Sequence, residues 1–167
     1  MDKSRMERGA HIIIDQWVNL KPDESLCIVT SNLHYQEALM LEDEALKRRG
    51  KVSVMIVPEE GIHVGNYFDD NPRIFDCYDV IIGASDYSIV TTKACDRAIR
   101  KGKKFLSLPL STTNHESMLG FDFLTTDTDI SKLKAEILID HIKRCSTIRV
   151  ETAAGTDPKF SMRRRKP

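Results

Sequence analysis

Short apolar runs alternate with amphipathic segments along this chain, and this alternation constrains its fold more than any other feature. Runs rich in β-branched residues predict four strands, at residues 26–31, 51–58, 79–85 and 104–110. Helical periodicity predicts helices at residues 4–20, 34–50, 91–102 and 129–145. Such alternation makes a parallel sheet with helices on both faces. We therefore expect an α/β fold with a doubly wound, flavodoxin-like, mostly parallel five-stranded sheet in the order 2-1-3-4-5.

The C-terminal part of the sequence predicts the fifth strand and a hairpin. Residues 147–152 read as the fifth strand and 159–164 as a sixth, joined by "AAGTDP", whose Gly and Pro suit a tight turn. The long helix before them is amphipathic, with an apolar side that we expect to face inward: Ile130, Leu133, Ile137 and Leu138. The length of 167 residues fits a single domain spanning residues 1–167.

Composition excludes several classes of protein. Lys+Arg and Asp+Glu both number 25, and this balance argues against a nucleic-acid partner, which usually meets a basic face. The sequence has no apolar run of membrane-spanning length and no signal peptide at its start, so we expect no membrane contact and a cytoplasmic location. The four cysteines form no C-x-x-C pair, and in a reducing compartment we interpret them as ordinary buried or half-buried thiols.

A ligand site is expected where the strands end, because doubly wound sheets bind ligands at the carboxyl ends of their strands. The segments after the first and third strands are rich in side chains that can hydrogen-bond. They supply the candidate substrate-binding residues Thr30, Asn32, Ser85, Ser88, Thr91 and Thr92. The last three lie near the start of a predicted helix, where hydroxyls could hold an anion or simply cap the helix. Capping is the commoner role of Ser and Thr at such positions.

The sequence supplies no catalytic group and no metal ligands that we can name. His34 and His115 fall at strand ends, and His63 lies near Glu59 and Glu60 in a weak metal-like cluster. Zinc motifs such as H-E-x-x-H are absent, as are a G-x-G-x-x-G fingerprint and a Walker A lysine. Cys95 has no His or Lys arranged to activate it as a nucleophile.

Four segments resemble one protein family in the same order along the chain. "LKPDESLCIVT" is similar to a "VKPGE" segment and first strand of the aminopeptidase T-like metallo-aminopeptidases, the leucyl aminopeptidase family. "EALKRRGKVSVMIVP" resembles its next helix and strand, and "DVIIGASDYSIVTTKACDRAIRKGKKFLSLP" its most distinctive stretch. "IRVETAAGTDPKFS" resembles a "VTSPxGTDLTFS" hairpin. Related 2,5-dihydroxypyridine 5,6-dioxygenases contain the same half.

The resemblance implies a non-catalytic role for this chain. In the family, a second half beyond the hairpin carries the ligands of a divalent metal (Zn, Co, Mn or Fe), and this sequence stops at the hairpin. We therefore expect no cofactor in this chain, and a role beside the active site in substrate positioning or dimerisation. Its partner would be the missing C-terminal catalytic domain or a second copy. The family often has a histidine where this sequence has Thr91, so the role of that histidine does not carry over.

Two alternatives stay open. The chain could be a stand-alone small-molecule or anion-binding module, or the N-terminal domain of a dioxygenase-like ring-opening enzyme. A binding module should have a polar pocket containing Thr30, Asn32, Ser85 and Thr92. A docking domain should instead expose an apolar patch near the end of the chain. The terminal "RRRK" run could bind phosphate, but a solvated strand edge or the crossing into a second domain is the simpler interpretation.

Overall fold

The structure is a computed structural model that describes residues 2–58, 63–110 and 117–165. The chain consists of two compact units, Met1–Thr125 and Thr126–Pro167.

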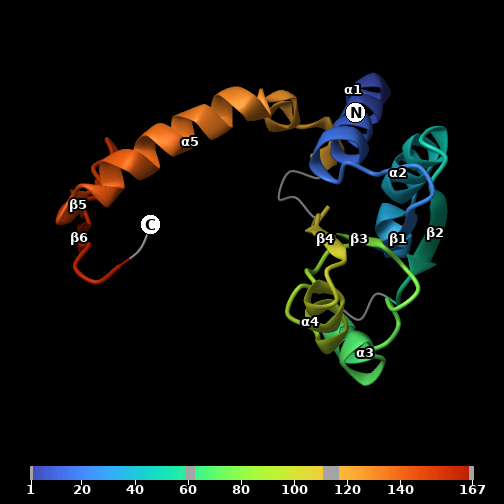
Figure 1. Cartoon of the computed structure of the whole chain (residues 1–167). Coiled ribbons are helices and arrows are strands. Elements are labelled where there is room, and N and C mark those ends of the chain that lie inside the picture. Colours follow the sequence, from blue (N-terminus) through green and yellow to red (C-terminus); the bar gives the residue numbers. More distant parts are fainter. Residues whose placement is uncertain (1, 59–62, 111–116, 166–167) are drawn as a thin grey trace. The chain divides into compact units, whose positions relative to one another are not determined.

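The first unit is built on a four-stranded parallel sheet (Figure 1). Its strands are β1 (Ser25–Thr30), β2 (Lys51–Ile56), β3 (Val80–Ala84) and β4 (Lys104–Ser107). The strands lie in the order β2-β1-β3-β4, so the sequence correctly predicted all four and their arrangement. β1 is central, with Cys27 opposite Ser53 of β2 and Ile81 of β3.

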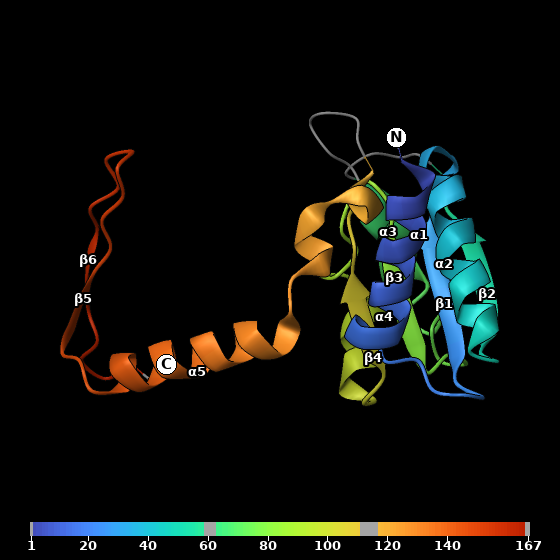
Figure 2. The same ribbon diagram turned by 90° about the horizontal axis from the view of Figure 1, so that it is seen from above.

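Helices cover both faces of this sheet, as the alternation predicted. Three of them, α1 (Lys3–Ile12), α2 (Tyr35–Lys47) and α4 (Lys93–Arg100), lie within predicted helices, whereas α3 (Val64–Asp70) lies where the sequence predicted none. α1 continues into a π-helical turn (Ile13–Trp17), and short 3₁₀ turns lie at Asn32–His34, Met118–Gly120 and Asp122–Thr125. α1 and α2 lie side by side over one face of the sheet (Figure 2).

Successive residues of the central strands enter two separate cores. Leu26 and Ile28 of β1 pack with α1 and α2, whereas Cys27 and Val29 pack with α3 and α4 on the other face. Side chains of a strand alternate between faces, and a strand buried on both faces therefore reads as a continuous apolar run. This explains why the apolar run of β3 was recognisable in the sequence.

The segment after β4 returns to α1 through a very close contact at Gly9. A Cβ atom at Gly9 would lie 2.0 Å from the carbonyl oxygen of Leu119. Only glycine allows the helix backbone to approach this closely, so Gly9 sets the position of the 3₁₀ turn Met118–Gly120.

The second unit contains α5 (Thr128–Lys143) and an antiparallel hairpin of β5 (Thr147–Arg149) and β6 (Lys159–Ser161). The predicted hairpin is confirmed. Its turn uses Gly155 at φ +93°, a conformation that favours glycine. Arg149 donates two hydrogen bonds to Asp157, at 2.6 and 2.9 Å, across the loop.

Two expectations for the C-terminal part differ from the structure. The predicted fifth strand does not join the described parallel sheet, because residues 147–149 pair with 159–161 instead. Pairing within a short hairpin closes a small loop and costs little chain entropy. Within the second unit, the apolar side of α5 is not covered as predicted, since none of the 16 helix residues is buried. Periodicity identifies an apolar side of a helix, not what covers it.

Candidate functional site

The polar residues at the carboxyl ends of β1 and β3 lie at a topological switch point. After β1 the chain enters α2 on one face of the sheet, and after β3 it enters α4 on the other face. The two connections therefore diverge between adjacent strands, which is where doubly wound sheets form a ligand crevice.

His34 joins the two connections across this point. It ends the 3₁₀ turn after β1, and its Nε2 lies 2.5 Å from Oδ1 of Asp86, which follows β3. Its Nδ1 lies 3.7 Å from Oε1 of Glu37 on α2. The side chains of His34 and Glu37 are each only 14% exposed. In a neutral ring, Asp86 selects the tautomer with the hydrogen on Nε2, which leaves a lone pair on Nδ1, whereas in a protonated ring Nδ1 forms an ion pair with Glu37.

Two buried polar atoms at this point have no hydrogen-bond partner. They are the Oγ of Ser31 and the Nδ1 of His34, and no other buried side-chain nitrogen or oxygen in the described residues shares this property. Native proteins pair nearly all buried polar groups, so each unpaired group calls for an explanation such as strain, a function or an ordered water. Here both unpaired atoms lie three residues apart at the switch point.

Two predicted substrate-binding residues belong to this region. Thr30 and Ser85 are buried at the ends of β1 and β3. The Thr30 hydroxyl donates a long 3.4 Å hydrogen bond to the Ser31 carbonyl. The Ser85 hydroxyl donates to the Tyr87 carbonyl at 3.0 Å. Both hydroxyls therefore have local backbone acceptors, and their role toward a ligand stays a prediction.

The remaining predicted residues are placed differently. Thr92 caps α4: its hydroxyl oxygen accepts from the Cys95 N–H at 3.4 Å, and the hydroxyl donates to the Ile89 carbonyl at 2.8 Å. Ser88 and Ser107 share a hydrogen bond of 2.9 Å. Asn32, Ser88 and Thr91 are exposed. The structure therefore gives Thr92 the capping role and does not gather all six predicted residues around one site.

Sequence reasoning noticed His34 at a strand end but missed Ser31, Glu37 and Asp86. Their signal was available in part, because "TSNLHYQE" and "ASD" place polar groups directly after two apolar strands. The pairing itself was not visible, since His34 and Asp86 are 52 residues apart in the chain.

The structure brings no metal-like cluster together among its described residues, where no three His, Cys, Asp or Glu side chains could hold an ion. His63 lies on the turn before α3 and is exposed. Glu59, Glu60 and His115 lie outside the described residues. None of the helices in the described part of the chain is long and apolar enough to cross a membrane.

The cysteines divide into two kinds. Cys27 and Cys95 are buried, and burial raises the pKa of these thiols to about 12 and about 11. They are therefore protonated and unreactive at neutral pH. Cys77 and Cys145 are exposed, which the sequence interpretation as buried or half-buried thiols did not anticipate.

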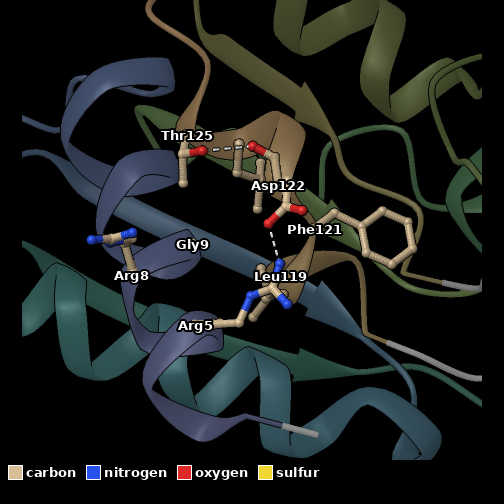
Figure 3. Close-up of a pocket in the computed structure, with 9 residues that line it drawn as sticks. Arg5, Arg8, Gly9, Leu119, Phe121, Asp122 and Thr125 are labelled. Carbon is tan, nitrogen blue, oxygen red and sulfur yellow. Dashed lines mark hydrogen bonds and ion pairs between the residues drawn. The ribbon is translucent and has the colours of Figure 1, made fainter.

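A small pocket of about 70 Å³ lies between α1 and the two 3₁₀ turns after β4 (Figure 3). Arg5 and Arg8 reach it from α1, and Arg5 pairs with the carboxylate of Asp122. The Thr125 hydroxyl donates to the Asp122 carbonyl at 2.7 Å. These contacts hold the turns against α1, and the one carboxylate of the pocket is already paired. The pocket is therefore explained by the packing of the two turns against α1, without a ligand.

Comparison with known proteins identifies no family for this chain. No protein-family model matches the sequence, and no curated protein is significantly similar to it.

Proposed function

We propose that this chain is the non-catalytic N-terminal domain of an aminopeptidase T-like leucyl aminopeptidase, and that it docks a metal-binding catalytic domain through α5. In this role it would flank the active site and help to position the substrate in a cytoplasmic metallopeptidase. The resemblance places the ligands of the divalent metal (Zn, Co, Mn or Fe) in the catalytic domain, so catalysis would need both parts.

The uncovered apolar side of α5 carries this proposal. Its residues follow the spacing i, i+3, i+7 and i+8, typical of a helix that packs on a partner. Ile130 and Ile137 are 52% and 53% exposed, and Leu133 and Leu138 are 58% and 60% exposed. We call these four residues the apolar stripe of α5. Soluble proteins rarely leave such a contiguous stripe in water, and large exposed patches mark interaction sites.

The neighbouring hairpin supports the choice of partner. It contains "GTDPKFS", the segment that resembles the family signature immediately before the catalytic half. Phe160 of β6 is also exposed, at 48%, so apolar surface is not confined to the helix. If docking placed a fifth strand next to β4, the parallel sheet would have the flavodoxin-like order 2-1-3-4-5 that the sequence predicts.

The test is a direct binding measurement between this chain and a separately produced catalytic domain of an aminopeptidase T-like enzyme. Calorimetry should detect a complex, and Leu133→Glu should weaken it by about 100-fold, because a buried charge replaces an apolar contact. Lys132→Gln changes the net charge by the same amount in the same turn and should leave binding unchanged. Absence of a complex at about 100 μM would contradict the proposal.

Two related binding experiments separate the alternatives. Sedimentation of the chain alone would reveal a dimer, the other partner that the resemblance implies. Binding to the catalytic half of a 2,5-dihydroxypyridine dioxygenase instead would assign the domain to that ring-opening class.

A second candidate function is small-molecule binding at the switch point. The observation that favours it is the pair of unpartnered buried atoms, the Ser31 Oγ and the His34 Nδ1. This candidate does not exclude docking, because the two surfaces use different residues.

A further inference from the structure

The charges of this chain are distributed unequally between its two units. Residues 1–125 contain 15 basic and 19 acidic residues, whereas residues 126–167 contain 10 basic and 6 acidic residues. The first unit therefore has a formal charge of −4 and the second +4, and the zero net charge of the whole chain conceals this difference. Such asymmetry is typical of proteins with a polyanionic partner. The balance that argued against a nucleic-acid partner does not hold for the second unit.

The hairpin brings four arginines of the second unit together. The Met162 N–H donates to the Ser146 carbonyl at 3.0 Å, one position beyond the last pair of β5 and β6. Arg144, two residues before Ser146, is the C-cap of α5. Residues 163–165 follow Met162 in a turn, which a hydrogen bond of 3.0 Å from the Arg165 N–H to the Met162 carbonyl closes. We define the arginine cluster as Arg144, Arg163, Arg164 and Arg165.

Carboxylates do not neutralise the arginine cluster. Its four side chains are exposed, and within the described part of the chain none of them forms an ion pair or a side-chain hydrogen bond. In the last turn of α5, Asp140 pairs with Lys143 at 3.3 Å. In the hairpin, Glu151 and Asp157 both pair with Arg149, at 3.0 and 2.6 Å. The four guanidinium groups therefore repel one another without a counter-charge, and an anionic partner would remove this repulsion.

The surroundings of the arginine cluster favour phosphate groups as its ligands. Guanidinium groups bind phosphates through paired N–H donors. Exposed hydroxyls of Ser146, Thr147 and Ser161 adjoin the cluster, and such hydroxyls commonly donate to the phosphates of nucleic acids. Phe160, next to Ser161, is 48% exposed and offers a ring on which an unpaired base can stack. Nucleic-acid interfaces are polar and positively charged, whereas the centres of protein interfaces are depleted of charge.

An anionic membrane fits this unit less well. A helix that lies on such a membrane has a polar face rich in Lys and Arg. The polar positions of α5 instead mix both signs of charge and include Asp129, Glu136 and Asp140. These carboxylates would be repelled by the anionic headgroups.

We infer that the arginine cluster binds the phosphate backbone of a single-stranded nucleic acid, with Phe160 as a stacking surface for one base. The guanidinium groups and the neighbouring hydroxyls contact phosphate oxygens, which carry no sequence information, so binding is independent of sequence. This surface does not include the apolar stripe of α5, and the inference is therefore independent of the proposed docking.

The test is fluorescence anisotropy of a labelled oligonucleotide of about 12 deoxythymidines, titrated with the whole chain at several salt concentrations. Binding should be saturable. The logarithm of the association constant should fall against the logarithm of the salt concentration with a slope of about −3, because each phosphate contact contributes about −0.7. A slope near zero, or no binding by about 100 μM protein in about 50 mM salt, would overturn the inference.

Matched variants of exposed residues locate the surface. Arg144→Gln should weaken binding several-fold and make the salt slope shallower by about 0.7. The combined variant Arg163→Gln, Arg164→Gln and Arg165→Gln should weaken binding by about tenfold or more. Lys132→Gln removes one charge from α5 outside the cluster and should change neither quantity. Equal effects of Arg144→Gln and Lys132→Gln would contradict a defined site.

The contribution of stacking is measured separately. Phe160→Ala should weaken binding by about tenfold and leave the salt slope unchanged, because it removes a ring and no charge. Unchanged affinity in this variant would overturn the stacking role of Phe160.

Two other polyanions decide the class of partner. Tighter binding to polyglutamate than to the oligonucleotide would assign the arginine cluster to an acidic protein. Tighter binding to vesicles with about one-third phosphatidylserine would assign it to a membrane. Either result would overturn the inference. The α5 variant Leu133→Glu should bind the oligonucleotide normally, so failure here and failure of docking are distinguishable.

Discussion

The two units of this chain treat their apolar side chains in opposite ways. In the first unit, Ile28 and Ile82 in the central strands are completely buried between two layers of helices. In the second unit, α5 has no buried residue although its sequence contains an apolar side. Burial of apolar area is the main favourable contribution to folding, so the first unit contains its own source of stability and the second does not.

Bidentate Arg–Asp pairs alone do not explain this difference, because each unit contains one. Arg97 donates two hydrogen bonds to Asp76 at 2.9 Å in the first unit, and Arg149 donates two to Asp157 in the second. Bidentate pairs of this kind orient segments but contribute little on an exposed surface. The second unit by itself leaves its apolar stripe uncovered, and the proposed docking would supply the cover.

The largest expected effect is on the core of the first unit. Ile82→Ala should lower the free energy of unfolding by about 2–5 kcal/mol, because it leaves a cavity in a fully buried position. Urea denaturation followed by circular dichroism measures this loss. A change below about 1 kcal/mol would mean that the first unit is not the stable core of the molecule.

A slightly smaller loss is expected where α1 meets the turn after β4. Gly9→Ala would place a methyl group 2.0 Å from the Leu119 carbonyl oxygen and should cost about 1–3 kcal/mol of stability. Gly65→Ala in α3 is the control, because its Cβ would meet only ordinary contacts at 3.6 Å. Equal stability of the two variants in thermal unfolding would contradict the close approach.

Lowering the pH should affect the ion pairs of the two units differently. Hydrogen bonds from Arg97 and Lys101 hold the pKa of Asp76 well below its usual 3.8, and a hydrogen bond from Arg149 lowers the pKa of Asp157. A depressed carboxyl pKa contributes stability above the unfolded value, and this contribution is lost as pH falls through the folded value.

The stability of the first unit should therefore decrease below about pH 4, and Asp76→Asn should reduce this pH dependence. Asp157→Asn should affect only the NMR signals of the hairpin. Denaturation at several pH values measures the first effect. If Asp157→Asn changed the acid stability as much as Asp76→Asn, the two units would unfold as one.

The smallest expected effect is on α5. Leu133→Ala should change the free energy of unfolding of the isolated chain by no more than about 0.5 kcal/mol, because the side chain is already exposed. The measurement is the same urea titration that serves Ile82→Ala. A loss comparable to that of Ile82→Ala would show that the apolar stripe is already buried in the free chain.

Much of the fold could be predicted because its signals are local. The apolar runs at β1 and β3 and the glycine turn of the hairpin lie within short segments of sequence. The partner of an amphipathic helix is not a local property, and the second unit by itself does not bury Ile130 and Leu133, which the sequence predicted to face inward.

The candidate site was predictable only in its position. The rule for doubly wound sheets pointed to the loops after β1 and β3, and two predicted residues, Thr30 and Ser85, do end these strands. The groups with unsatisfied chemistry are Ser31 and His34, which depend on how two distant loops meet. Thr92 caps α4, the commoner of the two roles that the sequence left open for hydroxyls near a helix start.

Hydrogen exchange of the backbone amides tests the central claim most directly. An isolated helix of 16 residues is marginal in water, so α5 should exchange orders of magnitude faster than β1 and β3 in the free chain. Addition of the catalytic domain should then slow exchange in α5 selectively. Protection of α5 equal to that of β1 and β3 in the chain alone would contradict the account.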